Sequence, residues 1–139
     1  MWSQNQHKRK ELSMNRSVII AVLFALVVLL GVTGIADTYR MKEQMSELLL
    51  SAEVAAIAGD IERATTEAET IQKKWDKNEK RLLLYMKHNE LDSIKQAIAE
   101  LKFLIQYRDT AEFCAKINEA LTMIEHIWES ELPTLKNIL

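Results

Sequence analysis

Glycine, proline and cysteine are scarce in this chain of 139 residues, which holds three, one and one of them, respectively. Beyond residue 36 only Gly59 and Pro133 remain, and strand signals are missing from the same region. Because glycine and proline mark most turns and helix breaks, their scarcity favours long helices. The single Cys114 excludes an internal disulfide. Its place between Phe113 and Ile117 predicts a small buried side chain, with a free exported thiol or an intermolecular bridge as the alternatives.

Motifs that carry known chemistry are also missing from the sequence. No glycine-rich elbow or anion-binding loop lies near a serine, and no phosphate-cradling motif is present. We therefore expect a protein that is not an enzyme and holds no cofactor. Residues 37–139 contain 14 basic and 19 acidic residues, a net charge of −5, which argues against nucleic acid as a partner.

The chain does contain one long stretch without charge, residues 18–36, with the sequence VIIAVLFALVVLLGVTGIA. As a helix these residues cover about 28 Å, close to the thickness of about 30 Å of a bilayer's hydrocarbon core. Thr33 is the only polar side chain, and its hydroxyl can bond back to its own helix. We predict a tail at residues 1–17, a transmembrane segment at 18–36 and a domain at 37–139, with the lipid bilayer as a partner.

The residues before this segment predict its orientation. The tail has no apolar periodicity, is expected to be disordered and carries a net charge of +3. Its charged residues are Lys8, Arg9, Lys10, Arg16 and the single acid Glu11. Since basic flanks stay in the cytoplasm, we expect a single-pass protein of the cell membrane with a cytoplasmic amino terminus and an extracytoplasmic domain. The alternative is a secreted protein, cleaved near Ala36, because Gly34 and Ala36 form a small-x-small site.

Apolar residues repeat at steps of three and four through four segments of residues 37–139. The stripes comprise Met41, Met45, Leu48, Ala52 and Ala55; Ile61, Ala64, Ala68, Ile71, Trp75, Asn78, Leu82 and Tyr85; Leu91, Ile94, Ile98, Leu101 and Ile105; and Phe113, Ile117, Ala120, Ile124 and Ile127. We predict an all-α fold in which an antiparallel up-and-down bundle of three to four helices follows the transmembrane helix. The second segment, about 27 residues, should outlast the third, about 16 residues.

Helix caps are predicted at the breaks between these segments. Gly59 suits a helix end and Asp60 an N-cap, Asn89 is a plausible cap for the third segment, and Asp109 with Glu112 resembles a capping box. Pro133 should end the last helix. Asn78, the one polar member of a stripe, either fixes the register of the bundle or lies at an exposed end of the packed region.

The strongest candidates for a metal site lie at the second break. They are His88, Glu90 and Asp92, approached by His126 of the last segment. Imidazole and carboxylate are ligands of divalent transition metals, but Glu90 follows His88 by two residues and points away from it on a helix. We therefore predict no metal site, and the default interpretation is helix capping by Asn89 and Asp92 with hydrogen bonding by His88.

Basic residues cluster in the second segment, where a partner could dock. They are Lys73, Lys74, Lys77, Lys80 and Arg81, followed by Lys87. One interpretation is a docking surface for an acidic partner or a lipid headgroup. The other is a solvated helix face, complemented within the bundle by acids of the last segment.

Four short motifs resemble the uncharacterised bacterial family called domain of unknown function 4363. They are GDIERA at residues 59–64, QKKWDKNEKR at 72–81, HNELD at 88–92 and NIL at 137–139, with Ile61 in place of the tryptophan that follows Gly-Asp in the family. The resemblance implies a short protein with one amino-terminal hydrophobic segment and a helical remainder. It also implies a location in the cell envelope and supplies no catalytic residue.

Two functions from different classes fit these observations. The first is a non-catalytic, membrane-anchored interaction or scaffolding protein of the bacterial envelope, such as an accessory subunit of another membrane protein. The second is an extracytoplasmic domain that senses or binds a small molecule or ion. A sensor needs an output module, for which the 17 residues before the apolar segment leave no room, so we favour the first. Homo-oligomerisation through Gly31 and Gly34 is a further possibility.

Overall fold

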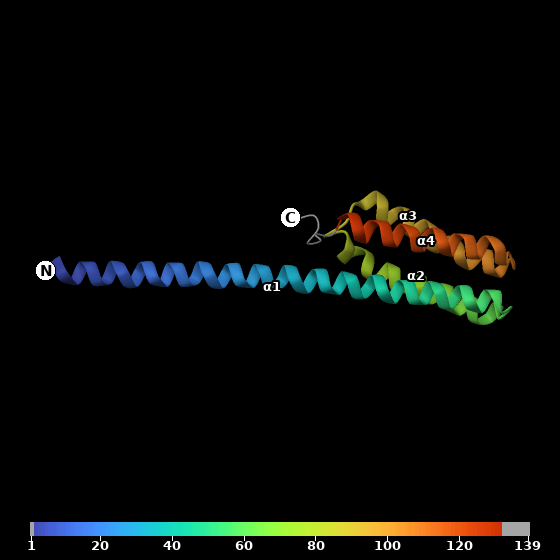
Figure 1. The fold of residues 1–139 in the computed structure, drawn as a ribbon, viewed down its shortest axis with the longest axis horizontal. Coiled ribbons are helices and arrows are strands. Elements are labelled where there is room, and N and C mark those ends of the chain that lie inside the picture. The colour runs from blue at the N-terminus through green and yellow to red at the C-terminus, as the bar shows by residue number, and fades with distance from the viewer. Residues whose placement is uncertain (1, 132–139) are drawn as a thin grey trace. The chain divides into compact units, whose positions relative to one another are not determined.

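A computed structural model describes the backbone of residues 2–131 and the side chains of residues 16–130. Within this range the chain is all-α, without strands. The helices are α1 (Trp2–Ile57), α2 (Ile61–Leu82), α3 (His88–Gln106) and α4 (Thr110–Glu131) (Figure 1). The predicted helix end at Pro133, the NIL motif and the side chains of the basic tail cluster lie outside the described residues. The chain divides into two compact units, Met1–Asp37 and Thr38–Leu139.

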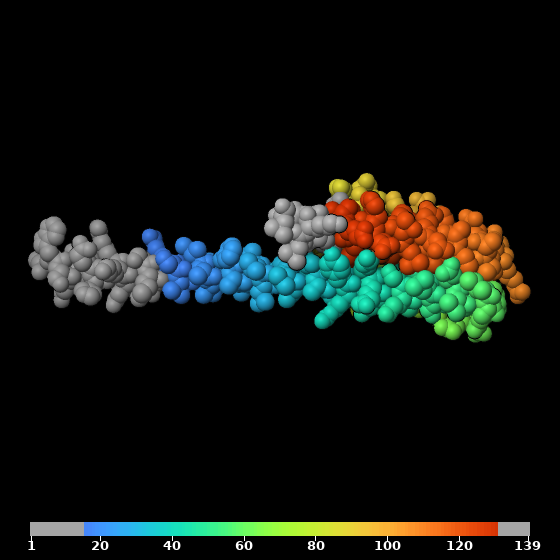
Figure 2. All heavy atoms as spheres, viewed as in Figure 1, coloured from blue at the N-terminus to red at the C-terminus, as the bar shows by residue number. Residues whose placement is uncertain are grey.

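The first unit contains a single helical stretch with exposed apolar side chains. Residues 16–33 are all exposed (Figure 2). The Thr33 hydroxyl donates hydrogen bonds to the carbonyls of Leu29 and Leu30, at 2.9 and 3.1 Å, as its back-bonding role predicts. The disordered tail was a wrong expectation, because α1 is helical from Trp2. Residues 2–17 lack glycine and proline, so an existing helix can extend through them without a new nucleation step.

The second unit is organised around one hydrophobic core to which all four helices contribute. Most of the predicted stripe positions are buried, and the largest fully buried side chains are Trp75, Trp128, Phe113 and Met45. On α1 the inward position is Leu49, while Leu48 is only partly buried. Asn78 is buried, its amide donating to the Lys74 carbonyl at 2.7 Å and accepting from Arg81. The structure thus places this polar residue inside the packed region.

Two of the three turns have the predicted caps. Gly59 has a φ of +78°, a left-handed conformation that ends α1, and the Asp60 carboxylate accepts from the Arg63 N–H at 3.1 Å. At the α3–α4 turn the Asp109 carboxylate accepts from the Glu112 N–H at 3.1 Å. Here Arg108, with a φ of +58°, occupies the left-handed position that glycine fills in the first turn.

The α2–α3 boundary differs from the prediction. The second segment ends at Leu82 and the third begins at His88, so the helices have 22 and 19 residues rather than about 27 and 16. Lys87 is the N-cap of α3 and makes no side-chain cap bond, while Asn89 lies inside the helix. The N–H of Met86 bonds to the Leu82 carbonyl at 2.9 Å, and Met86 is buried. Tyr85, predicted to continue the stripe, is exposed instead because the chain turns before reaching it.

Polar contacts connect each helix of the second unit to its neighbours. Trp128 Nε1 of α4 donates to the Thr38 carbonyl of α1 at 2.9 Å, and Ser51 Oγ of α1 donates to Glu67 Oε1 of α2 at 2.9 Å. Ion pairs then join α2 to α3 and α3 to α4; they are Lys95–Glu79 at 2.9 Å, Lys102–Glu69 at 2.8 Å and Lys116–Glu100 at 3.1 Å. These contacts are consistent with the predicted antiparallel arrangement, in which consecutive helices run in opposite directions (Figure 1).

Candidate functional site

The structure divides the four candidate metal residues into two pairs, His88 with Asp92 and Glu90 with His126. His88 Nε2 lies 3.4 Å from Asp92 Oδ2, one turn along α3, and both side chains are more than half exposed. Glu90 instead approaches Lys87 Nζ, at 3.9 Å. Within the described residues no group of three or more His, Cys, Asp or Glu side chains is placed to hold a metal ion. His88 and Asp92 therefore form a surface ion pair when the imidazole is protonated.

Glu90 and His126 both line a hollow of about 270 Å³ between α3 and α4. Its other lining residues are Ser93, Thr122, Met123 and Ile127. One carboxylate oxygen of Glu90, Oε2, is buried and has no hydrogen-bond partner. One imidazole and one carboxylate fall short of the three protein ligands that a catalytic zinc site uses. This pairing depends on the register of two antiparallel helices, for which spacing along the sequence gives no direct signal.

The basic cluster forms an outward strip on α2. Lys73, Lys77, Lys80 and Arg81 are exposed and Lys74 is partly buried, whereas Ile71, Trp75 and Leu82 of the same helix are in the core. Two acids of α2, Glu69 and Glu79, make the ion pairs to α3. Hydrogen bonding to Lys102 lowers the pKa of Glu69, and hydrogen bonding to Glu79 raises the pKa of Lys95. Thus α2 uses acidic side chains toward α3 and presents lysines to solvent.

The α4 helix carries an ion-paired lysine, Lys116, and the partly buried thiol of Cys114. Lys116 pairs with Glu119 one turn along α4 at 2.7 Å and with Glu100 of α3 at 3.1 Å, and hydrogen bonding to these two carboxylates raises the pKa of Lys116. Cys114 packs against the core but is only partly buried, whereas a buried side chain was predicted. Burial, followed by the nearby charge of Glu53, raises the pKa of the Cys114 thiol and keeps it in its less reactive form.

An apolar surface that the stripes did not predict lies at the α2–α3 turn. Leu83, Leu84 and Tyr85 are exposed one after another, and Leu84 is 76 % exposed. Lys80 and Arg81 precede them, and Lys87 follows. The sequence feature that could have indicated this surface is the run of three leucines directly after the basic cluster. Because Leu82 and Tyr85 continue the helical spacing, the run was assigned to the helix rather than to a turn.

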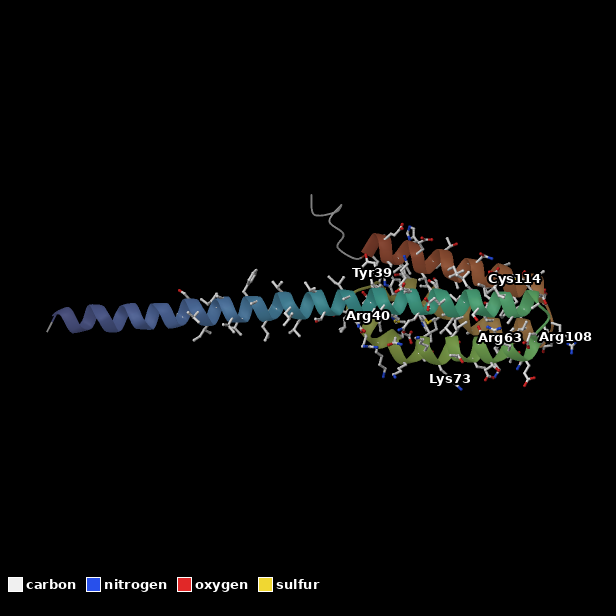
Figure 3. The ribbon with its side chains drawn as sticks, turned by 60° about the horizontal axis from the view of Figure 1, so that its bottom comes forward. Tyr39, Arg40, Arg63, Lys73, Arg108 and Cys114 are labelled. Atoms are coloured by element: carbon white, nitrogen blue, oxygen red, sulfur yellow. The ribbon has the colours of Figure 1, made fainter. Side chains whose placement is uncertain are left out.

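A second outward surface lies on α1. A shallow hollow of about 620 Å³ is lined by Tyr39, Arg40, Lys42, Glu43, Ser46, Glu47 and Leu50. Leu50, Val54 and Ile57 continue along this helix as exposed apolar side chains. Tyr39 and Arg40 lie at one end of the second unit, while Arg63 and Arg108 lie at the other (Figure 3).

Together the fold and these surfaces define an all-helical protein with one apolar helical segment and a second unit that presents basic and apolar surface patches. The chain belongs to the family described as domain of unknown function (DUF4363), whose model matches residues 33–138. This confirms the resemblance seen in the four short motifs. Neither the curated proteins nor the solved structures include a significant match.

Proposed function

We propose that this protein is a non-catalytic interaction or scaffolding protein of the bacterial envelope, anchored in the membrane by residues 18–36. The observation that carries the proposal is a helical segment, within Arg16–Ile57, that is apolar enough to cross a membrane and has none of its most apolar 18 residues buried. Residues 18–32 expose twelve large apolar side chains. At about 0.3–0.6 kcal/mol each, their transfer into hydrocarbon contributes about 4–7 kcal/mol.

The charges on either side support an orientation with the amino terminus in the cytoplasm. The tail contains four Lys and Arg residues, whereas residues 37–56 contain only two, Arg40 and Lys42. Basic residues near a membrane segment are retained on the cytoplasmic side, so the second unit is extracytoplasmic. There it forms an antiparallel up-and-down bundle whose core is filled by its own side chains. Its outward surfaces are then available to a partner.

The partner that we favour is another membrane protein, bound as an accessory subunit binds its complex. Lys73, Lys77 and Lys80 provide an exposed basic strip on α2 that suits an acidic protein surface. Copurification from native membranes after crosslinking tests this role. A stoichiometric partner supports the proposal, whereas a chain that crosslinks to lipid or to itself alone contradicts it. Lys73→Glu with Lys77→Glu should lower the yield of the partner, and Glu62→Lys provides a control change on the same helix.

Protease accessibility in wall-stripped cells tests the anchor and its orientation. A carboxy-terminal tag should be removed by external protease while the membrane remains intact. Protection until lysis would place the second unit in the cytoplasm and overturn the orientation. Intact-mass measurement of the membrane fraction tests the alternative of secretion, because a mature chain that begins near residue 37 would show that the segment is a cleaved signal.

A second candidate function, ion or small-molecule binding, is favoured by the hollow between α3 and α4. Glu90 and His126 line it, and Glu90 Oε2 has no hydrogen-bond partner. A ligand that binds the folded state raises the melting temperature. Because two protein donors fall short of a zinc site, we would titrate the full chain in detergent with a small organic cation, methylammonium, and compare Glu90→Gln with the exposed control Asp92→Asn. A rise in melting temperature that Glu90→Gln abolishes and Asp92→Asn retains would support binding in this hollow.

A further inference from the structure

The α2–α3 turn combines the residue types that favour a membrane surface. Leu83, Leu84 and Tyr85 are exposed apolar or amphipathic side chains in a single turn. Tyrosine is enriched at the level of the lipid headgroups, and leucine enters the boundary between headgroups and acyl chains. Leu84 is 76 % exposed and contributes most of this apolar surface, with Leu83 and Tyr85 at 39 % and 37 % beside it.

Basic side chains flank this turn on both sides. Residues 79–87 contain Lys80, Arg81 and Lys87 against one acid, Glu79, and therefore have a net charge of +2. Glu79 is already occupied by an ion pair with Lys95 of α3, and Lys87 Nζ lies 3.9 Å from Glu90 Oε1 while most of the Lys87 side chain remains exposed. The turn thus presents positive charge beside apolar side chains, the combination found in segments that lie on anionic lipid surfaces.

Contacts inside the second unit place this turn at the same end as Thr38. Trp128 of α4 bonds to the Thr38 carbonyl, and its neighbours His126 and Ile127 line one hollow with Glu90. Glu90 lies in the first turn of α3, directly after the α2–α3 turn. The view in Figure 3 agrees, because it shows Tyr39 and Arg40 at one end of this unit and Arg63 and Arg108 at the opposite end.

Chain connectivity ties Thr38 to the membrane surface. Thr38 follows Ala36, the last residue of the apolar segment, by two residues. Consecutive Cα atoms are about 3.8 Å apart, so Thr38 lies within about 8 Å of the end of an inserted segment. The headgroup region on each side of the hydrocarbon is about 5–8 Å deep. The end of the second unit that carries Thr38 is therefore held near headgroup level.

We propose that the α2–α3 turn is a second membrane contact, in which Leu83, Leu84 and Tyr85 enter the lipid interface while Lys80 and Lys87 bind anionic headgroups. This inference rests on the proposed insertion of residues 18–36. It gives the second unit two points of attachment, one through the covalent anchor and one through the turn. Two points restrict how the unit can tilt over the bilayer and so limit which outward surfaces a partner meets.

Site-specific fluorescent labels on the full chain test this contact. In a Cys114→Ala background, single labels are attached through Leu84→Cys at the turn, Tyr107→Cys at the opposite end and Leu26→Cys inside the apolar segment. The three sites are exposed, so labelling leaves the core intact. Each chain is reconstituted in phosphatidylcholine vesicles with or without about 30 % phosphatidylglycerol, which gives the surface a negative potential. Quenching is measured with a headgroup-nitroxide lipid and with aqueous iodide.

The proposal predicts that the label at 84 is quenched by the lipid nitroxide and shielded from iodide in anionic vesicles, while the label at 107 behaves in the opposite way. Lys80→Gln with Lys87→Gln should reduce the lipid quenching at 84 at least about twofold. Lys73→Gln with Lys77→Gln removes the same charge from the middle of α2 and should leave it unchanged. Circular dichroism verifies that both double variants keep the same helicity.

Each failure has a distinct signature. A label at 84 that is as open to iodide as the label at 107, with position 26 shielded, overturns the second contact and leaves the anchor standing. Iodide access to position 26 overturns the anchor itself. Equal lipid quenching at 84 with and without phosphatidylglycerol contradicts the role of the basic side chains. A label at 84 that neither quencher reaches shows that protein covers the turn, which also contradicts the proposal.

Discussion

Two stretches of α1 are equally helical but differ in how their apolar residues are arranged. Residues 18–32 carry apolar side chains on all sides, and all of these are exposed. Residues 38–57 carry them mainly as a stripe, and Met41, Met45, Leu49 and Ala52 are buried. A stripe needs neighbours on one side only, which α2 and α4 supply, whereas a helix that is apolar all round needs an apolar environment on every side. Within one helix, the period of the pattern therefore decides which partner is required.

Charged substitutions in the first stretch should have the largest effect, because they oppose its insertion into the membrane. Leu26→Lys with Leu29→Lys adds two charges near the middle of residues 18–36, at a cost of about 5–7 kcal/mol for insertion. That cost offsets most of the apolar gain, so the variant should leave the membrane fraction on carbonate extraction. The melting temperature of the second unit should stay the same, because these side chains take no part in its core. Full retention of the variant in the membrane would contradict the anchor.

The striped stretch should respond to the face that is changed. Leu49 is fully buried and its neighbour Leu50 is 49 % exposed. Leu49→Asp buries an unpaired carboxylate and should cost more than about 4 kcal/mol, enough to unfold a marginally stable unit. Leu50→Asp should cost less than about 1 kcal/mol. Urea unfolding followed by circular dichroism measures both, and equal losses would mean that the stripe is not the packed face.

A smaller effect is expected where the striped stretch begins. Trp128→Phe removes the hydrogen bond to the Thr38 carbonyl, and we expect a loss of about 1–2 kcal/mol in the free energy of unfolding. Trp75→Phe is the matched control. Its indole Nε1 is buried without a hydrogen-bond partner, so the same substitution removes packing area but no bond. If both variants lose the same stability, the Trp128 bond contributes nothing beyond packing.

The sequence predicted what depends on local period and missed what depends on contacts between segments. The stripes, the Asp60 cap and the Asp109 cap follow from residue type and spacing, and the structure has them. The α2–α3 turn was misplaced because Leu82–Tyr85 continues an apolar pattern, and only the burial of Met86 fixes where the chain reverses. The hollow shared by Glu90 and His126 needs the register of α3 against α4. Such features require tertiary geometry, which one-dimensional patterns do not contain.

Substitutions in the turns should have the smallest effect on stability. The turns matter to the striped stretch because they reverse the chain and so bring the other helices against it. Gly59 and Arg108 both adopt left-handed backbone conformations, but only glycine does so without steric cost. Arg108→Gly should raise the free energy of unfolding by about 0.5–1 kcal/mol, since relief of strain exceeds the added entropy of the unfolded chain. Gly59→Ala should lower it by about 1 kcal/mol, although a Cβ there would meet no neighbouring atom within 4 Å. Urea midpoints shifted in opposite directions would show that backbone conformation, rather than side-chain contact, controls both turns. Because neither substitution touches residues 18–36, both variants should remain in the membrane fraction.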